Sequence, residues 1–258
     1  MTPDFLFDWP PWGMFLFVLA MTGIVAVVIH QVLKTAIAKR SLTRISDLSP
    51  MLQTLCGTLF VLSVTFLANT VWTTEDRAGE IVHAEARSLR VIRTYMDAMT
   101  GPAHDAFLKL TQDYAAASAA EWETMAEQGG SPQAEAALSA IYRAVLQGFS
   151  AGDDNRLLQQ RMLVELDELS SARAQRITMA QEIVSGGQWF TVVALALLFL
   201  SVIGICHARW PASRAVALGI ITLAISISLF VIVVHDRPFY GQQQVTPQPV
   251  LEAAGLAG

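Results

Sequence analysis

The stretch "VWTTEDRAGEIVHAEARSLRVIR", residues 71–93, joins an apolar segment to a charged one without an interruption. No glycine or proline separates Trp72, the last apolar residue, from the first charge at Glu75. Because those two residue types are the usual helix breakers, we predict that one helix continues through the junction. A membrane span and the first helix of a polar region would then form one rod of about 49 residues, roughly 70 Å long at the rise of an α-helix.

The composition of the whole chain is that of a membrane protein. Of its 258 residues, 53% are hydrophobic and 15% are charged, and the mean hydropathy is +0.44. Soluble domains are less apolar, and about a quarter of their residues are charged. The net charge of -5 argues against a nucleic-acid-binding protein, which needs a basic face.

Four apolar stretches are each long enough to cross a bilayer as a helix, which takes about 20 residues. They are residues 13–33, 51–72, 188–206 and 215–234, and none of them contains Asp, Glu, Lys or Arg. We therefore expect an all-α integral membrane protein with four transmembrane helices and a four-helix extramembrane domain inserted between the second and third. The expected divisions are a first transmembrane hairpin at 1–72, the extramembrane domain at 73–187, a second hairpin at 188–234 and a tail at 235–258.

Helix-breaking residues divide the polar region into its four expected helices. The breaks are "TGP" at 100–102, "GGSP" at 129–132 and "AGDDN" at 151–155. Proline is well tolerated in the first turn of a helix, so Pro102 and Pro132 are expected to begin the second and third helices. The second should continue to about Glu127. The last should run from about Asp154 to Ser185, with Gly186 and Gly187 as a hinge before the third span.

The first and last of these helices each carry an apolar stripe at helical spacing. One stripe is Ala78, Ile81, Val82, Leu89, Ile92, Met96 and Met99, and the other is Leu158, Met162, Leu166, Leu169, Ala172, Ile177, Ala180 and Ile183. Glu85 falls on the first stripe, and Arg173 and Arg176 occupy similar positions on the second. Because an unpaired buried charge is costly, we predict that Glu85 pairs with Arg173 or Arg176 across antiparallel helices. We favour a structural ion pair, and the alternative is a charged ring around a pore in an oligomer.

The second span carries an unusual number of polar residues near one helix face. These residues are Thr54, Thr58, Thr65 and Asn69. Hydroxyl groups in a span bond to their own helix or to a neighbour, and we favour that packing interpretation. The alternative is that they line a wet path, with Phe60 and Phe66 as hydrophobic constrictions. If any span lines a pore, the second is the best candidate.

Several classes of activity are disfavoured by what the sequence lacks. No span carries an acidic residue of the kind that couples transport to protons or sodium. There is no P-loop, HExxH, GxSxG or GxGxxG motif, and the histidines show no ligand-like spacing. Glu121 and Glu123 are two residues apart, so they do not face each other on a helix and are expected on a solvated face. We therefore expect no enzyme, no catalytic residue, no metal site and no cofactor.

The short loops carry the basic residues that set membrane orientation. They are Lys34, Lys39, Arg40 and Arg44 in the first loop and Arg209 and Arg214 in the second. The positive-inside rule puts both loops in the cytoplasm, with the termini and the polar region on the outer side of a bacterial plasma membrane. The N-terminus carries Asp4, Asp8 and two tryptophans, so we expect an interface anchor rather than a cleaved signal.

The last span ends in "VIVVHDRPFYG", residues 231–241. Pro238 is expected to stop the helix there, while Arg237 reaches the membrane interface and Asp236 marks the water boundary. This exit motif, together with residues 71–93 and "LDELSSARAQRI" at 166–177, resembles the bestrophin-like domain family of bacterial membrane proteins. The residues that carry the resemblance are Trp72, Arg77, Ala78, Glu85, Ala86, Arg173, Arg176, Asp236, Arg237, Pro238, Phe239 and Gly241.

The resemblance implies kinship with bestrophins, which are pentameric anion channels whose second span lines the pore. It therefore implies a homo-oligomeric channel subunit in the lipid bilayer that conducts a small ion. It also implies that the helical region is cytoplasmic, whereas the loop charges favour the outer side. The alternative function is a non-conducting membrane sensor or scaffold whose helical domain binds a partner or ligand.

Overall fold

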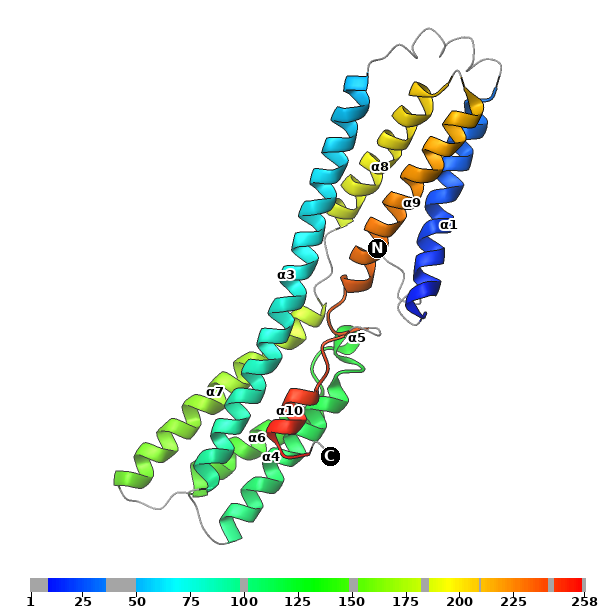
Figure 1. The fold of residues 1–258 in the computed structure, drawn as a ribbon. Helices are drawn as coiled ribbons and strands as arrows, with labels where there is room; N and C mark the ends of the chain where they lie inside the picture. The colour runs from blue at the N-terminus through cyan, green and yellow to red at the C-terminus, as the bar shows by residue number, and fades with distance from the viewer. Residues whose placement is uncertain are drawn as a thin grey trace. The chain divides into compact units, whose positions relative to one another are not determined.

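The computed structural model describes residues 9–35, 50–97, 102–148, 153–181, 186–208, 210–240 and 244–256, and these are helical with no β-strand among them. The elements are α1 (Pro11–Val32), α3 (Pro50–Asp97), α4 (Pro102–Glu121), α5 (Met125–Gln128), α6 (Pro132–Gly148), α7 (Asp153–Gln181), α8 (Gly186–Cys206), α9 (Pro211–His235) and α10 (Gln248–Ala253) (Figure 1). The expected all-α class is confirmed. Five of these helices begin at a proline, which fits the first turn of a helix because it lacks the N–H group that would be unpaired there.

Some of the residues named above lie outside the described ranges. They are Asp4, Asp8, Lys39, Arg40, Arg44, Met99, Ile183, Arg209 and Gly241. Residues 182–185 are also outside these ranges, so the hinge before the third span stays a prediction, although α8 begins at Gly186.

The helix predicted to pass through the junction at residues 71–93 is continuous. It is α3, which has 48 residues and shows no break between Pro50 and Asp97. The chain forms two compact units, which divide α3 between Thr73 and Thr74. One unit comprises residues 1–73, 184–236 and 241–243, and the other comprises residues 74–183, 237–240 and 244–258.

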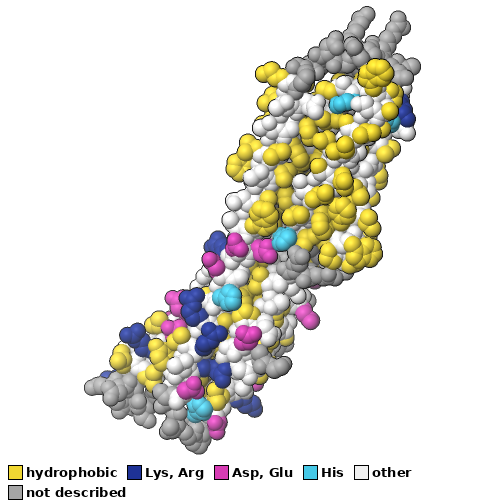
Figure 2. Space-filling view, viewed as in Figure 1, with side chains coloured by type: hydrophobic (Ala, Val, Ile, Leu, Met, Phe, Trp, Pro, Cys, Tyr) yellow, Lys and Arg dark blue, Asp and Glu magenta, His cyan; other side chains and the backbone are white. Residues whose placement is uncertain are grey.

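The first unit contains the four helices that are long and apolar enough to cross a membrane among the residues described. They are α1, the first part of α3, α8 and α9. Figure 2 shows hydrophobic side chains gathered over this unit, in contrast to the Lys, Arg, Asp and Glu side chains over the other. A hydrophobic exterior is unfavourable in water and favourable in lipid, so these helices have the surface of a membrane bundle.

Close side-chain contacts join the helices of the first unit. Between α1 and α9, the hydroxyl oxygens of Thr22 and Ser226 lie 2.7 Å apart in a hydrogen bond. Between α3 and α8, the rings of Phe60 and Phe199 stack with their centroids 6.1 Å apart. Without a hydrophobic driving force in lipid, such packing and hydrogen bonds are what hold spanning helices together.

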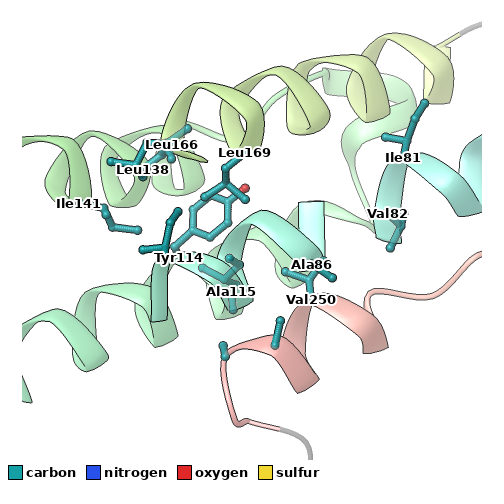
Figure 3. Packing of buried hydrophobic residues seen from close by; sticks show 14 of the residues in the cluster. Ile81, Val82, Ala86, Tyr114, Ala115, Leu138, Ile141, Leu166, Leu169 and Val250 are labelled. Atoms are coloured by element: carbon teal, nitrogen blue, oxygen red, sulfur yellow. The ribbon is translucent and has the colours of Figure 1, made fainter. Parts of the chain in front are cut away.

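The second unit has its own apolar core, made of side chains from α3, α4, α6, α7 and α10 (Figure 3). The predicted stripes supply much of it, since Ala78, Ile81, Val82, Leu89, Ile92, Met96, Met162, Leu166, Leu169 and Ala172 are buried. From the other stripe positions in the described ranges, Leu158, Ile177 and Ala180 are half-buried. The amphipathic spacing in the sequence therefore identified the packed faces of α3 and α7.

The second helix of the polar region is shorter than predicted, because α4 ends at Glu121 and a turn separates it from α5. The indole Nε1 of Trp122 donates to the carbonyl oxygen of Val245 at 2.8 Å, and its ring meets Phe239 edge-on. These contacts hold the buried Trp122 where the helix stops. A tertiary anchor of this kind overrides local helix propensity, and the sequence around Trp122 does not reveal it.

The C-terminal tail, expected as a separate segment, packs into the second unit. Phe239, Val250, Ala253 and Ala254 are all buried in its core. Arg93 of α3 donates from Nη1 to the carbonyl oxygen of Ala253 at 2.7 Å, at the end of α10. Residues of the C-terminal tail therefore complete the core of this unit, although they lie about 100 positions or more after α4 and α6 in the chain.

We predict that Gly204→Val destabilises the first unit. A Cβ at Gly204 would lie 2.8 Å from Leu33 Cδ1 and 2.9 Å from Ile29 Cγ2, so the branched side chain would overpack the contact between α8 and α1. We expect a loss of about 1–3 kcal/mol in the free energy of unfolding, measured by denaturation in detergent micelles. Gly219→Ala is the matched control, because nothing lies within 4 Å of a Cβ there. Equal effects of the two substitutions would contradict the packing described.

Candidate functional site

A fully buried carboxylate lies at the centre of the second unit. Glu85 of α3 is 0% exposed, and its Oε2 accepts a hydrogen bond from Arg176 Nε of α7 at 2.7 Å. Its Oε1 accepts from the hydroxyl groups of Tyr114 at 2.8 Å and Ser118 at 2.9 Å, both on α4. The carboxylate is therefore paired with an opposite charge and saturated by donors, which a buried charge requires.

A second carboxylate extends this network toward α6. Glu121 accepts from Arg173 Nη2 at 2.7 Å and from Arg176 Nη2 at 3.1 Å, and the backbone N–H of Ser131 also donates to it. Arg173 Nη1 donates in turn to Glu135 at 2.6 Å. The three carboxylates and two guanidinium groups thus connect α3, α4, α6 and α7.

The network assigns partners that the sequence left open. Glu85 pairs with Arg176, while Arg173 bridges Glu121 and Glu135. The expectation that Glu121 lies on a solvated face is wrong, since its side chain is 1% exposed. The overlooked signal was its spacing from Tyr114 and Ser118, seven and three positions earlier, which places all three on one face of α4.

Two donors of the network, Arg176 and Tyr114, hold their protons firmly near neutral pH. Burial disfavours the charge on Arg176, but the adjacent Glu85 carboxylate outweighs it and raises the pKa of the guanidinium above its ordinary value. Burial, followed by the charge and hydrogen bond of Glu85, raises the pKa of Tyr114 well above its ordinary range. Both groups stay protonated at working pH, so they act as fixed donors. The arrangement is suited to holding helices together and not to acid–base chemistry.

Arg176 has two further contacts that hold its side chain in place. Its guanidinium carbon lies 4.0 Å from the centre of the Trp122 ring, and Nη1 donates to the Met125 sulfur at 3.1 Å. A guanidinium over an indole face is a favourable cation–π contact, and it is strongest where water is excluded. The same Trp122 that ends α4 therefore also covers the ion pair.

The predicted pore face of α3 lies in the first unit. Thr58 Oγ1 donates to the carbonyl oxygen of Thr54 at 2.9 Å, and Thr65 Oγ1 donates to that of Val61 at 2.8 Å. Thr54, Thr58 and Thr65 are exposed and line a shallow groove of about 510 Å³ with Gly57 and Phe199, and Asn69 is also exposed. Because these threonine hydroxyls bond to their own helix, the face is compatible with either lipid or a wet path.

The two candidate constriction residues have different surroundings. Phe60 is 5% exposed and stacked on Phe199 within the chain, whereas Phe66 is 65% exposed and projects from the unit. The structure therefore does not bring the two rings together. Phe66 alone is available to a neighbouring subunit or an aqueous path.

The exit motif begins where α9 ends, at His235. In the first unit, Asp236 follows as the C-cap residue with its N–H bonded to the Val233 carbonyl at 3.3 Å, and it is buried. In the second unit, Pro238 accepts a backbone hydrogen bond from Val245 at 2.7 Å, and Phe239 packs against Trp122. Arg237 is half-buried. The position of the water boundary at Asp236 stays a prediction.

We predict that Glu85→Gln destabilises the second unit by about 3 kcal/mol, the low end for a broken buried ion pair, because Arg176 loses one carboxylate and keeps Glu121 at 3.1 Å. The free energy of unfolding of purified protein in detergent micelles is the measurement. The double variant Glu85→Met with Arg176→Met should recover most of the loss, since Glu121 keeps Arg173 as its partner. Additive losses from the two single substitutions would show that the pair is not coupled.

The family profile of the bestrophin-like domain matches residues 18–250. A search of curated proteins finds no match. Among solved structures, a bacterial bestrophin homologue from Klebsiella pneumoniae is similar at 12% sequence identity and a TM-score of 0.71, covering 94% of this chain and 99% of that chain. Two variants of that homologue match over 93% of this chain and 99% of theirs at 13% identity, with TM-scores of 0.71 and 0.70. At such low identity these structures show the fold alone, and with the profile match they lead to one conclusion. The chain is a multi-pass membrane protein that belongs to the bestrophin-like family.

Proposed function

We propose that the protein is a subunit of an oligomeric ion channel, with α3 of each copy facing the conduction path. The observation that carries the proposal is the exposed face of α3 in the first unit, where Phe66 projects and Thr54, Thr58 and Thr65 line a groove beside Phe199 of α8. A ring of such faces would present hydroxyl groups and one aromatic constriction to permeating ions. Conduction of anions by a pentamer is what kinship with bestrophins implies for this family member.

The saturation of Glu85 supports a structural role for the ion pair over a charged pore ring. Its carboxylate oxygens accept hydrogen bonds from Tyr114, Ser118 and Arg176, and none of its surface is exposed. A carboxylate that attracts or repels ions in a pore has to face water. Glu85 and Arg176 therefore serve to fix the helical unit, and selectivity is assigned to the uncharged face of α3.

We expect purified protein in liposomes to pass chloride faster than potassium, measured as flux with ion-selective dyes. Phe66→Ala should change the flux by about threefold or more, because it removes the proposed constriction. Phe190→Ala is the matched control, since Phe190 of α8 is as exposed but lies off the proposed path. Flux that is equal in both variants and the wild type would remove α3 as the pore helix. An absence of flux from folded, oligomeric protein would favour the sensor or scaffold alternative.

We further propose that the second unit is an extramembrane domain on the outer side of the plasma membrane. The charged surface of this unit supports an aqueous location, and the basic residues in the loops support the outer side. A cytoplasmic unit, as in bestrophins, is the competing arrangement.

We expect an impermeant thiol reagent to label Gln147→Cys in intact cells, in a background where Cys56 and Cys206 are replaced by alanine. Gln147 is exposed near the end of α6, so reagent on the correct side has access to it. Labelling that requires lysis would place the unit in the cytoplasm. A cysteine at Lys34, between the first two spans, should show the opposite pattern.

A further inference from the structure

The first turn of α9 contains a buried cation with unpaired donors. Arg214 is 0% exposed, and its Nε donates to His30 Nδ1 of α1 at 3.2 Å. Both of its Nη atoms are buried, and neither has a hydrogen-bond partner within the described ranges. No carboxylate in those ranges forms an ion pair with it. This is unlike Arg173 and Arg176, whose donors are satisfied by Glu85, Glu121 and Glu135.

The chemistry of a guanidinium limits what satisfies it. The group is charged at all working pH values and offers a planar fork of donors, so a buried, unpaired fork is strongly unfavourable. Oxyanions such as phosphate match the fork with two parallel hydrogen bonds. A phosphate oxygen pair is therefore the ligand chemistry that Arg214 is built to accept.

His30 adds a second donor beside Arg214. Because its Nδ1 accepts from Arg214, the ring proton is on Nε2, and the imidazole is neutral. The Nε2–H group is then available to donate. His30 also lines a groove between α1 and α9, together with Gln31.

The rest of the groove is open and mostly apolar, with Gln31 and Thr222 as its other polar lining residues. It has a volume of about 450 Å³ and is lined by small residues that include Gly23 and Ala26 of α1 and Ala215 and Gly219 of α9. A Cβ added at Gly23 or Gly219 would meet nothing within 4 Å. An acyl chain fits such a furrow along two spanning helices, whereas a free ion makes no use of it.

We propose that this groove binds an anionic phospholipid, with its phosphate on Arg214 and His30 and an acyl chain along Gly23 and Gly219. Basic pockets between spanning helices bind anionic head groups in this way. Arg214 does not itself line the groove, but it lies beside it, bonded to His30 and next in sequence to Ala215, which both do. Binding therefore requires the guanidinium to turn toward the groove, where the phosphate supplies its missing acceptors. The inference rests on the α1–α9 pair alone and is independent of ion conduction by α3.

The test is native mass spectrometry of delipidated, full-length protein titrated with phosphatidylglycerol, phosphatidylcholine or inorganic phosphate. We expect phosphatidylglycerol to bind roughly tenfold more tightly than phosphatidylcholine, with Arg214→Gln removing that preference. Gly219→Leu should weaken phosphatidylglycerol binding by filling the groove. Lys34→Gln is the matched control, because it removes one exposed charge beyond the end of α1 and should change binding less than about threefold.

Three results would overturn the proposal. The first is phosphatidylglycerol binding that Arg214→Gln leaves intact. The second is full displacement of phosphatidylglycerol by inorganic phosphate, with phosphate binding unchanged by Gly219→Leu. That result would identify a site for free phosphate. The third needs no variant of Arg214: a photoreactive phosphatidylglycerol bound to wild-type protein should crosslink to peptides containing residues 23–31 or 214–222. Crosslinks confined to other segments would contradict the assignment even if Arg214→Gln failed to fold.

Discussion

The buried pair of Glu85 and Arg176 is the constraint on which the helical unit depends. Each group is excluded from water, and Glu85 has Arg176 as the cation that offsets its charge, while Arg176 is shared with Glu121. The pair sets the register of α3 against α7, and Tyr114 and Ser118 fix α4 to the same carboxylate. A shift of one helix by a turn, about 5.4 Å, would leave a buried charge without its partner. Apolar packing alone would not impose so specific an arrangement on four helices.

The sequence predicted the features that depend on local composition. Four apolar stretches, a continuous α3 and the starts of α4 and α6 at Pro102 and Pro132 all follow from hydropathy and helix breakers, and the structure has them. The stripe containing Glu85 also marked a buried face from spacing alone. Such signals are carried by residues within a few turns of one another, which is why one sequence suffices to detect them.

The features that the sequence did not predict depend on distant contacts. Glu121 was misplaced because its partners, Arg173 and Arg176, are more than 50 positions away. The end of α4 depends on Trp122 meeting Phe239 and Val245, and nothing near Trp122 indicates that meeting. On α3, helical spacing grouped the threonines on one face. Phe60 is buried where it stacks on the distant Phe199, whereas Phe66 is exposed, and spacing along α3 does not reveal this difference.

The docking of the C-terminal segment has a consequence for biosynthesis. Val250 and Ala253 complete a core most of whose other members lie in α3, α4, α6 and α7, and they follow α8 and α9 in the chain. During translation, both later spans therefore leave the ribosome before the helical unit is able to close. Until then, the apolar surface that will face α10 is open to chaperones and proteases. A ribosome that stalls within α9 would release a chain with its spans made and this core unfinished, which is a state that quality control is able to recognise.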